Sequence, residues 1–275
     1  MERSVMSKYS EIKKINVNHI KKMKGSEKIV SITAYDYTSA RIVDDAGVEI
    51  ILVGDSLGMV VAGYDNTLPV TLEETIYHCK YVKNAAKRSF LVADMPFGSY
   101  QISVEDGLRN CFRVIKETGF EAVKLEGGIE IIPLVKKLVQ NGINVMGHIG
   151  LMPQMVNTMG GYKIQGRSNS ETLLNEALEL ENAGVFSIVL EGVIENVAKE
   201  ITEKLKIPTI GIGSGRYCDG QILVFHDVFG LYDDMTPKFV KKYCDGRNII
   251  LNAAKLYIKE TKNGIFPSVE NVFLE

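Results

Sequence analysis

Short apolar runs alternate along most of the chain with segments in which apolar residues recur every three or four positions. Runs bounded by glycine or polar residues are typical of buried strands, and the periodic segments are typical of amphipathic helices. The pattern predicts strands at residues 28–33, 50–54, 90–94, 122–126, 144–148, 187–191, 208–213 and 221–229. It predicts helices at residues 12–23, 36–45, 71–87, 103–118, 129–140, 170–183, 195–206 and 236–264.

Three of the predicted helices begin with a recognisable start signal. Two residue pairs have the spacing of a capping box, namely Thr71 with Glu74 and Ser103 with Asp106. The Thr-Pro dipeptide at 236–237 has the order expected for an N-cap followed by the first helical residue. We therefore expect helices to begin at these three places.

Strand and helix alternate without a change in composition or a Pro- or Ser-rich linker, which indicates a parallel sheet. About eight such units in roughly 250 residues match a (β/α)8 TIM barrel. An open doubly wound sheet also alternates, but it concentrates its ligand groups at one switch point. We predict one barrel domain over residues 1–275, with an N-terminal capping helix, frayed residues 1–10 and a tail at 265–275.

The composition is ordinary for a globular protein, with 45% hydrophobic and 24% charged residues in a chain of 275. A net charge of −2 and the lack of a basic patch argue against a nucleic-acid partner. No apolar run approaches the ~18 residues of a membrane span, and the first residues lack a signal-peptide core. Cys79, Cys111, Cys218 and Cys244 form no C-x-x-C pair, so we expect reduced, mostly half-buried helix thiols in a cytoplasmic protein.

Polar residues stand at the ends of five consecutive predicted strands. They are Asp55 with Ser56, Asp94, Lys124 with Glu126, His148, and Glu191. A barrel brings the C-terminal ends of its strands together around one mouth, so this pattern predicts an active site there. The segments 55–70 and 150–169 are long for barrel loops, where ~2–6 residues is usual, and the glycine-rich second one is typical of a lid.

Asp55, Asp94 and Glu126 are the candidate metal ligands. Single carboxylates from neighbouring strands suit Mg²⁺, which prefers hard oxygen ligands and keeps several of its waters. Such a site suggests an oxo-acid chelated through its carboxylate and keto oxygens, with an enolate forming beside them. The alternative is that each carboxylate only caps the helix that follows its strand.

Three further polar residues each have more than one interpretation. Lys124 either binds a substrate carboxylate or forms a buried ion pair with Glu126 or a neighbour. His148 is a ligand, an acid/base group, a substrate contact or a hydrogen-bonded core residue. Glu191 is either a general base near the metal-bound substrate or a structural partner of Lys124.

Long, ordered motifs of this chain resemble those of the 3-methyl-2-oxobutanoate (ketopantoate) hydroxymethyltransferase family. They include Ile-Thr-Ala-Tyr-Asp at 32–36, Val-Gly-Asp-Ser-Leu-Gly at 53–58, Ala-Asp-Met-Pro-Phe at 93–97, Val-Lys-Leu-Glu-Gly-Gly at 123–128 and Gly-His-Ile-Gly-Leu at 147–151. Matching segments also lie at 65–71, 160–167, 210–215 and 219–223, and the resemblance runs from about residue 17 to 267. The main departure is Gly192, where many relatives have Cys after the glutamate.

The resemblance implies a Mg²⁺-dependent barrel enzyme, with one ion per subunit, that makes ketopantoate for pantothenate and coenzyme A synthesis. The one-carbon donor would be 5,10-methylenetetrahydrofolate, and the assembly a homodecamer of two pentameric rings. By motif, Asp55, Asp94 and Glu126 would hold the metal. Asp55, Ser56, Asp94 and Lys124 would contact the keto acid, and Glu191 would accept the proton.

Two other functional classes agree less well with the sequence. The isocitrate lyase and phosphoenolpyruvate mutase group of Mg²⁺ barrels carries a Cys-Gly-His loop, and none of the four cysteines here precedes Gly-His. A non-catalytic metabolite-binding barrel would be expected to have lost some of the polar strand ends, all of which are present. No short motif marks a folate pocket.

Overall fold

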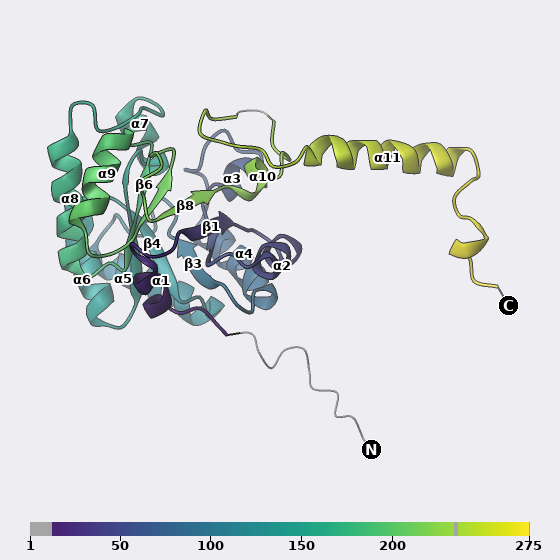
Figure 1. Ribbon diagram of the computed structural model, residues 1–275. Coiled ribbons are helices and arrows are strands. Elements are labelled where there is room, and N and C mark those ends of the chain that lie inside the picture. The colour runs from purple at the N-terminus through teal and green to yellow at the C-terminus, as the bar shows by residue number, and fades with distance from the viewer. Residues whose placement is uncertain (1–12, 234–235, 275) are drawn as a thin grey trace, which may run out of the picture. The chain divides into compact units, whose positions relative to one another are not determined.

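The computed structural model describes residues 13–233 and 236–274. Its strands close into a parallel barrel in chain order, with β8 hydrogen-bonded to β1 (Figure 1). The strands are β1 (Ile29–Thr33), β2 (Ile50–Val53), β3 (Phe90–Asp94), β4 (Ala122–Glu126), β5 (Asn144–Gly150), β6 (Ser187–Glu191), β7 (Thr209–Ile212) and β8 (Gly220–Leu223). The predicted (β/α)8 barrel is confirmed, and the open doubly wound sheet is excluded.

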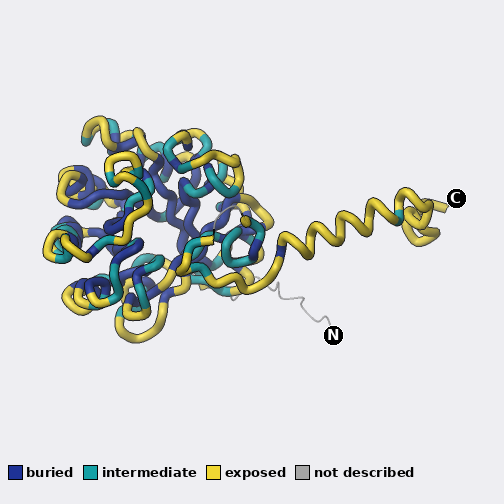
Figure 2. Tube along the Cα trace, turned by 90° about the horizontal axis from the view of Figure 1, so that it is seen from above, coloured by how far each residue is buried: buried dark blue, intermediate teal, exposed yellow. Residues whose placement is uncertain are grey.

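The longer helices follow the strands and cover the outside of the barrel, so that buried strands lie within a ring of helices whose outer faces are exposed (Figure 2). They are α2 (Tyr37–Ala46), α4 (Leu72–Ala85), α5 (Val104–Thr118), α6 (Ile132–Gln140), α8 (Ser170–Ala183) and α9 (Glu195–Lys204). Helix α1 (Val17–Met23) precedes β1, and the connections also contain the short helices α3 (Leu57–Val60) and α7 (Val156–Met159) and the 3-10 turns η1 (Ile129–Ile131) and η2 (Pro153–Met155). None of the helices within 13–233 and 236–274 has the length and apolar character needed to cross a bilayer.

The barrel interior is apolar toward the N-terminal ends of the strands and polar toward their C-terminal ends. The apolar cluster includes Ile29, Ile50, Leu52, Phe90, Val92, Ala122, Met146, Phe186, Val189, Ile210 and Ile222. Farther along the strands, Asp94 pairs in register with Lys124, and Glu126 with His148. Paired residues of parallel strands face the same side, so these four polar side chains share the interior.

Helix α1 packs against the apolar end of the barrel. Its N-cap is Asn16, which forms a capping box with His19 and starts the helix at Val17. Ile15 and Ile20 then join the apolar cluster inside the strands. The predicted capping helix is therefore confirmed from residue 17 onward, while Ile12 and the frayed segment 1–10 lie outside the described residues.

Two strand predictions were wrong by more than one residue at an end. Strand β5 does not stop at His148 but continues through Gly150, because β6 offers a longer edge in which Gly150 pairs with Glu191. Strand β8 ends at Leu223 instead of extending to residue 229, since α10 (Phe225–Val228) begins almost at once.

Of the two predicted capping boxes, one is complete in the structure and the other is only half formed. Thr71 and Glu74 form the predicted capping box. Ser103 caps α5 by accepting from the amide of Asp106, but the Asp106 carboxylate turns to Arg109 and Asn110 instead of completing the box.

The cysteines also differ from expectation: all four are free thiols, but three are fully buried and only Cys244 is exposed.

The chain divides after Val224 into two compact units. The second contains α10, α11 (Gly246–Lys262) and η3 (Val269–Asn271). The predicted helix start at 236–237 was wrong, because the chain folds back first: the amides of Tyr243 and Gly246 donate to the carbonyls of Val228 and Phe229. A single domain over residues 1–275, ending in a tail, stays a prediction.

The burial of Ile20 generates a prediction about stability. Its side chain is fully buried among the interior residues. Ile20→Ala should lower the free energy of unfolding in urea by about 2–5 kcal/mol, through lost apolar contact and a residual cavity. The exposed Lys22→Ala on the same helix is the control, with an expected change within about 0.5 kcal/mol. Equal effects of both changes would contradict the packing of α1 against the barrel.

Candidate active site

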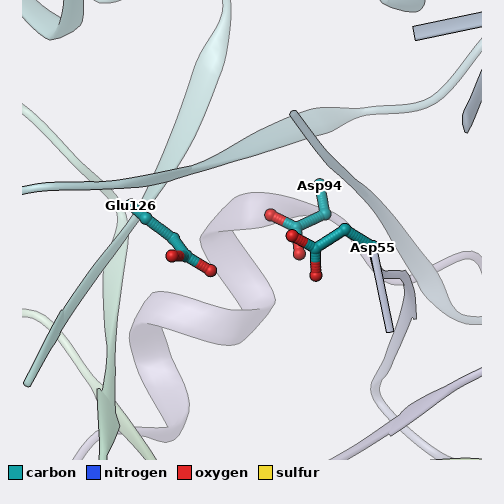
Figure 3. A group of neighbouring side chains, drawn as sticks. All are labelled: Asp55, Asp94 and Glu126. Carbon is teal, nitrogen blue, oxygen red and sulfur yellow. The ribbon is translucent and has the colours of Figure 1, made fainter. Parts of the chain in front are cut away.

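Three buried carboxylates converge at the C-terminal ends of β2, β3 and β4 (Figure 3). Asp55, Asp94 and Glu126 each offer an oxygen, and these oxygens lie within 4.8 Å of one another. The helices that follow these strands are not capped by them: the N-cap residues of α3, α4, α5 and α6 are Ser56, Thr71, Ser103 and Ile131. The capping alternative therefore fails, and the three carboxylates form one acidic cluster.

Lys124 neutralises part of the acidic cluster. Its Nζ lies 2.5 Å from Asp94 Oδ1 and 3.7 Å from Glu126 Oε1, with both ion pairs almost fully buried. Burial alone would lower the pKa of Lys124, but the charges of Asp94 and Glu126 outweigh it and raise that pKa. The ion-pair interpretation of Lys124 is thus realised, and its partner is chiefly Asp94.

The pKa values of the three carboxyls are shifted by their burial and by the charges next to them. Burial, aided by the charges of Asp94 and Glu126, raises the pKa of Asp55 well above its ordinary value. Burial also raises the pKa of Asp94, although Lys124 opposes it. Glu126 differs, because His148 and Lys124 outweigh its burial and lower its pKa. Full ionisation of the cluster is therefore unfavourable in the metal-free protein, and a bound cation would stabilise the ionised carboxylates.

His148 lies between two carboxylates. Its Nδ1 is 3.3 Å from Glu126 and its Nε2 is 3.3 Å from Glu191. Burial and Lys124 oppose a charge on the ring, yet these carboxylates outweigh them and raise the pKa of His148 to about 9. The ring is therefore cationic at neutral pH and links Glu191 to the acidic cluster. Glu191 contacts His148, and its side chain is 18% exposed at the mouth.

Ser56 lies beside the acidic cluster, and its hydroxyl is 2.9 Å from that of Tyr35. Gly54 leaves room for this arrangement, since a Cβ there would stand 3.0 Å from Ser56 Oγ and 3.6 Å from Asp94 Oδ2. All the residues predicted at strand ends are thus brought to one place.

Both long loops contain short helices. The first holds α3, and the second holds η2 and α7. The second loop is tied to the end of β6, because Gln165 forms a parallel bridge with Val193 and its amide donates to the carbonyl of Gly192. This attachment places the loop backbone next to Glu191.

Sequence reasoning missed Gln154 and Tyr100, which pack against the acidic cluster. Gln154 donates to Asp55, and the Tyr100 hydroxyl lies 2.8 Å from Gln154 Oε1. Neither residue ends a strand or has a metal-ligand side chain in a spaced motif, so alternation gave no signal. The only indication was the unusual length of the loop that carries Gln154.

The donor set fits a hard divalent cation. Three carboxylate oxygens, no sulfur ligand and a surplus of buried negative charge are what Mg²⁺ or a similar ion requires. The neighbouring lysine and histidine compensate only part of that charge.

A closed barrel with a buried acidic centre at its C-terminal mouth defines a (β/α)8-barrel enzyme with a candidate metal site. A family model described as ketopantoate hydroxymethyltransferase matches residues 14–269. The chain belongs to this family. The resemblance of its motifs is thereby confirmed.

Named relatives agree with the family model. The chain is 57% identical over 263 residues to a 3-methyl-2-oxobutanoate hydroxymethyltransferase of Thermotoga maritima, covering 95% of this chain and 97% of the relative. It is 55% identical over 263 residues to an enzyme of the same name from Carboxydothermus hydrogenoformans, covering 94% of this chain and 95% of that protein.

Solved structures of other enzymes share the fold. A phosphonopyruvate hydrolase crystallised with oxalate and Mg²⁺ aligns with a TM-score of 0.61 at 10% identity, over 94% of this chain and 93% of that one. A 2,3-dimethylmalate lyase aligns with a TM-score of 0.61 at 14% identity, over 94% and 87%. At such low identity these similarities bear on the fold alone.

The buried Lys124–Asp94 pair generates the second prediction. Lys124→Met should lower the free energy of unfolding by about 3–5 kcal/mol, because it leaves buried carboxylates without their counter-charge. The loss of stability relative to the wild type should become smaller as the pH falls. Without Lys124 the pKa of the buried Asp94 carboxyl in the folded state rises further, so its protonation at low pH stabilises the folded variant.

The double variant Lys124→Met/Asp94→Asn serves as its control, since it removes both charges of the pair. It should be more stable than Lys124→Met in the same urea titration. A single variant as stable as the wild type at neutral pH would show that the ion pair is energetically unimportant.

Proposed function

We propose that this protein is a 3-methyl-2-oxobutanoate hydroxymethyltransferase of pantothenate biosynthesis. It transfers a hydroxymethyl group from 5,10-methylenetetrahydrofolate to the keto acid and yields 2-dehydropantoate. The observation that carries this proposal is the acidic cluster at the barrel mouth, in a chain 57% identical to an enzyme of that name. Water supplies the hydroxyl oxygen of the product, and tetrahydrofolate is released.

Asp55, Asp94 and Glu126 are proposed to hold one Mg²⁺ per subunit. Their oxygen ligands, mutual proximity and burial support this role. When bound, the ion acts as a Lewis acid that makes the hydrogen on C3 of the keto acid more acidic.

The keto acid is proposed to bind through Lys124, Asp55, Ser56 and Asp94. Lys124 keeps further N–H donors beyond its contact with Asp94, so it can also donate to a substrate carboxylate. The hydroxyl of Ser56 stands close to Gly54 and beside the Asp94 carboxylate, so it can donate to a substrate oxygen at the same place.

Glu191 is the proposed base that removes the proton from C3. It stands at the edge of the acidic cluster and does not belong to the set of proposed metal ligands, so a bound metal ion would not occupy its lone pairs. His148 is a poorer candidate, because both of its ring nitrogens face carboxylates and its raised pKa keeps both protonated. His148 is instead proposed to orient Glu191.

The active assembly is proposed to be a cytoplasmic homo-oligomer, a decamer as the family resemblance implies. Within its own compact unit, helix α11 has Gly246 as its buried residue and exposes large apolar side chains. They include Ile249, Ile250, Leu256, Tyr257 and Ile258. Such side chains need a protein surface to cover them, and we propose that further copies of this chain take part in covering them.

The third prediction tests activity and metal together. The protein should form 2-dehydropantoate from the keto acid and methylenetetrahydrofolate with Mg²⁺, and should stop when a chelator is in excess. Asp94→Ala should abolish both turnover and Mg²⁺ binding by calorimetry, whereas Asp45→Ala on the exposed face of α2 should preserve them.

The Mg²⁺ affinity should also fall as the pH is lowered. Protons compete with the cation for Asp55 and Asp94, whose pKa values are raised in the metal-free protein. Full turnover in excess chelator would contradict the metal requirement, and lack of product with metal present would contradict the activity itself.

The fourth prediction assigns the base. In D₂O with Mg²⁺, with and without tetrahydrofolate, the wild type should exchange the C3 hydrogen of the keto acid for deuterium, as followed by NMR. Glu191→Gln should stop the exchange, because an amide cannot accept the proton, while keto-acid binding stays near normal. Exchange that survives in Glu191→Gln but disappears in His148→Asn would assign the base to His148.

A further inference from the structure

We propose that Gln154 is a positioning residue, which ties the 150–169 loop to the acidic cluster and holds Asp55 in the orientation that binds the metal. This inference rests on the proposed function, because it concerns the same metal site. Gln154 lies in η2 and is only 3% exposed, although it belongs to a loop.

The side-chain amide of Gln154 is fully hydrogen-bonded. Its Nε2 lies 2.9 Å from the carbonyl oxygen of Met95 and 3.1 Å from Asp55 Oδ2. Its Oε1 lies 2.8 Å from the Tyr100 hydroxyl and 3.1 Å from Gln101 Nε2. Both donors and both acceptor positions of the amide are therefore used.

These partners also determine which way the amide points. The Met95 carbonyl can only accept, so the NH₂ end must face it. The second hydrogen of that NH₂ is then directed at Asp55, while the oxygen faces the donors Tyr100 and Gln101. A flipped amide would set its oxygen against two acceptors and is excluded on the same ground.

The backbone of Gln154 holds a second carboxylate. Its N–H donates to Glu126 Oε2 at 3.1 Å. One loop residue therefore fixes two of the three carboxylates, whereas Asp94 is held by Lys124. The Gln154 side chain donates to the Asp55 carboxylate and so helps to set the orientation of Asp55.

The same loop continues to Gln165, which is bridged to Val193 beside Glu191. The loop thus supports the acidic cluster through Gln154 and borders the proposed base through its far end. Hydrogen bonds that orient a metal ligand are worth about 10–100-fold in metal affinity when removed. We therefore expect Gln154 to control Mg²⁺ affinity without touching the ion.

The test compares Gln154→Met, which keeps the side-chain length but removes the amide, with Gln101→Met as matched control. Gln101 is an exposed amide in the same network, and its side chain bonds to Gln154 and to the backbone amides of Gly98 and Tyr100. By calorimetry with Mg²⁺ alone, Gln154→Met should bind about tenfold more weakly or worse than the wild type, and Gln101→Met should bind within about twofold of it. In kinetics, the Mg²⁺ concentration at half-maximal rate should rise for Gln154→Met.

A purely structural role predicts a different result: lower unfolding free energy of Gln154→Met with an unchanged Mg²⁺ affinity, which would overturn the proposal. If Gln154→Met does not fold, Gln154→Asn replaces it, since its shorter amide cannot reach both Met95 and Asp55. A Gln154→Asn protein with wild-type affinity would equally overturn the role. If the wild type itself fails to bind Mg²⁺, the metal part of the proposed function is wrong, and the role of Gln154 falls with it.

Discussion

The structure depends on balancing three carboxylates that are buried together inside one barrel. A buried charge without a partner is among the costliest features a protein can hold, and here Asp55, Asp94 and Glu126 lie within 4.8 Å of each other. Lys124 and His148 are placed inside the same interior and supply the counter-charges. The barrel register makes this possible, since it sets Lys124 beside Asp94 and His148 beside Glu126. What the two cations leave uncompensated is the charge that a metal ion can use.

Most of the fold and the proposed ligand set could be predicted from sequence because both follow from simple periodicity. Side chains alternate along a strand, and parallel strands end on one side, so polar residues at successive strand ends must meet. The structure agrees, since it brings together three carboxylates from successive strand ends, namely Asp55, Asp94 and Glu126. The pairing of Lys124 with Asp94, and not mainly with Glu126, depends on the stagger between two strands, which a single sequence does not reveal.

The features that escaped prediction are those decided by distant parts of the chain. Strand β5 extends past His148 because β6 lies alongside it, and residues 236–245 turn back toward α10 before α11 can begin. Gln154 was overlooked for a similar reason. A glutamine in a loop is ordinarily solvated, and only the folded barrel shows that its amide is buried against Met95 and Asp55.

Helix α1 and the apolar cluster fill one end of the barrel. Ile15 and Ile20 close the interior at one end, among residues such as Phe90 and Phe186, while the polar strand ends face the other. If the keto acid binds against Lys124 and Asp94 as proposed, it would enter the barrel from the polar end. The smaller substrate would then have to bind before the larger folate, and the product would leave after the folate.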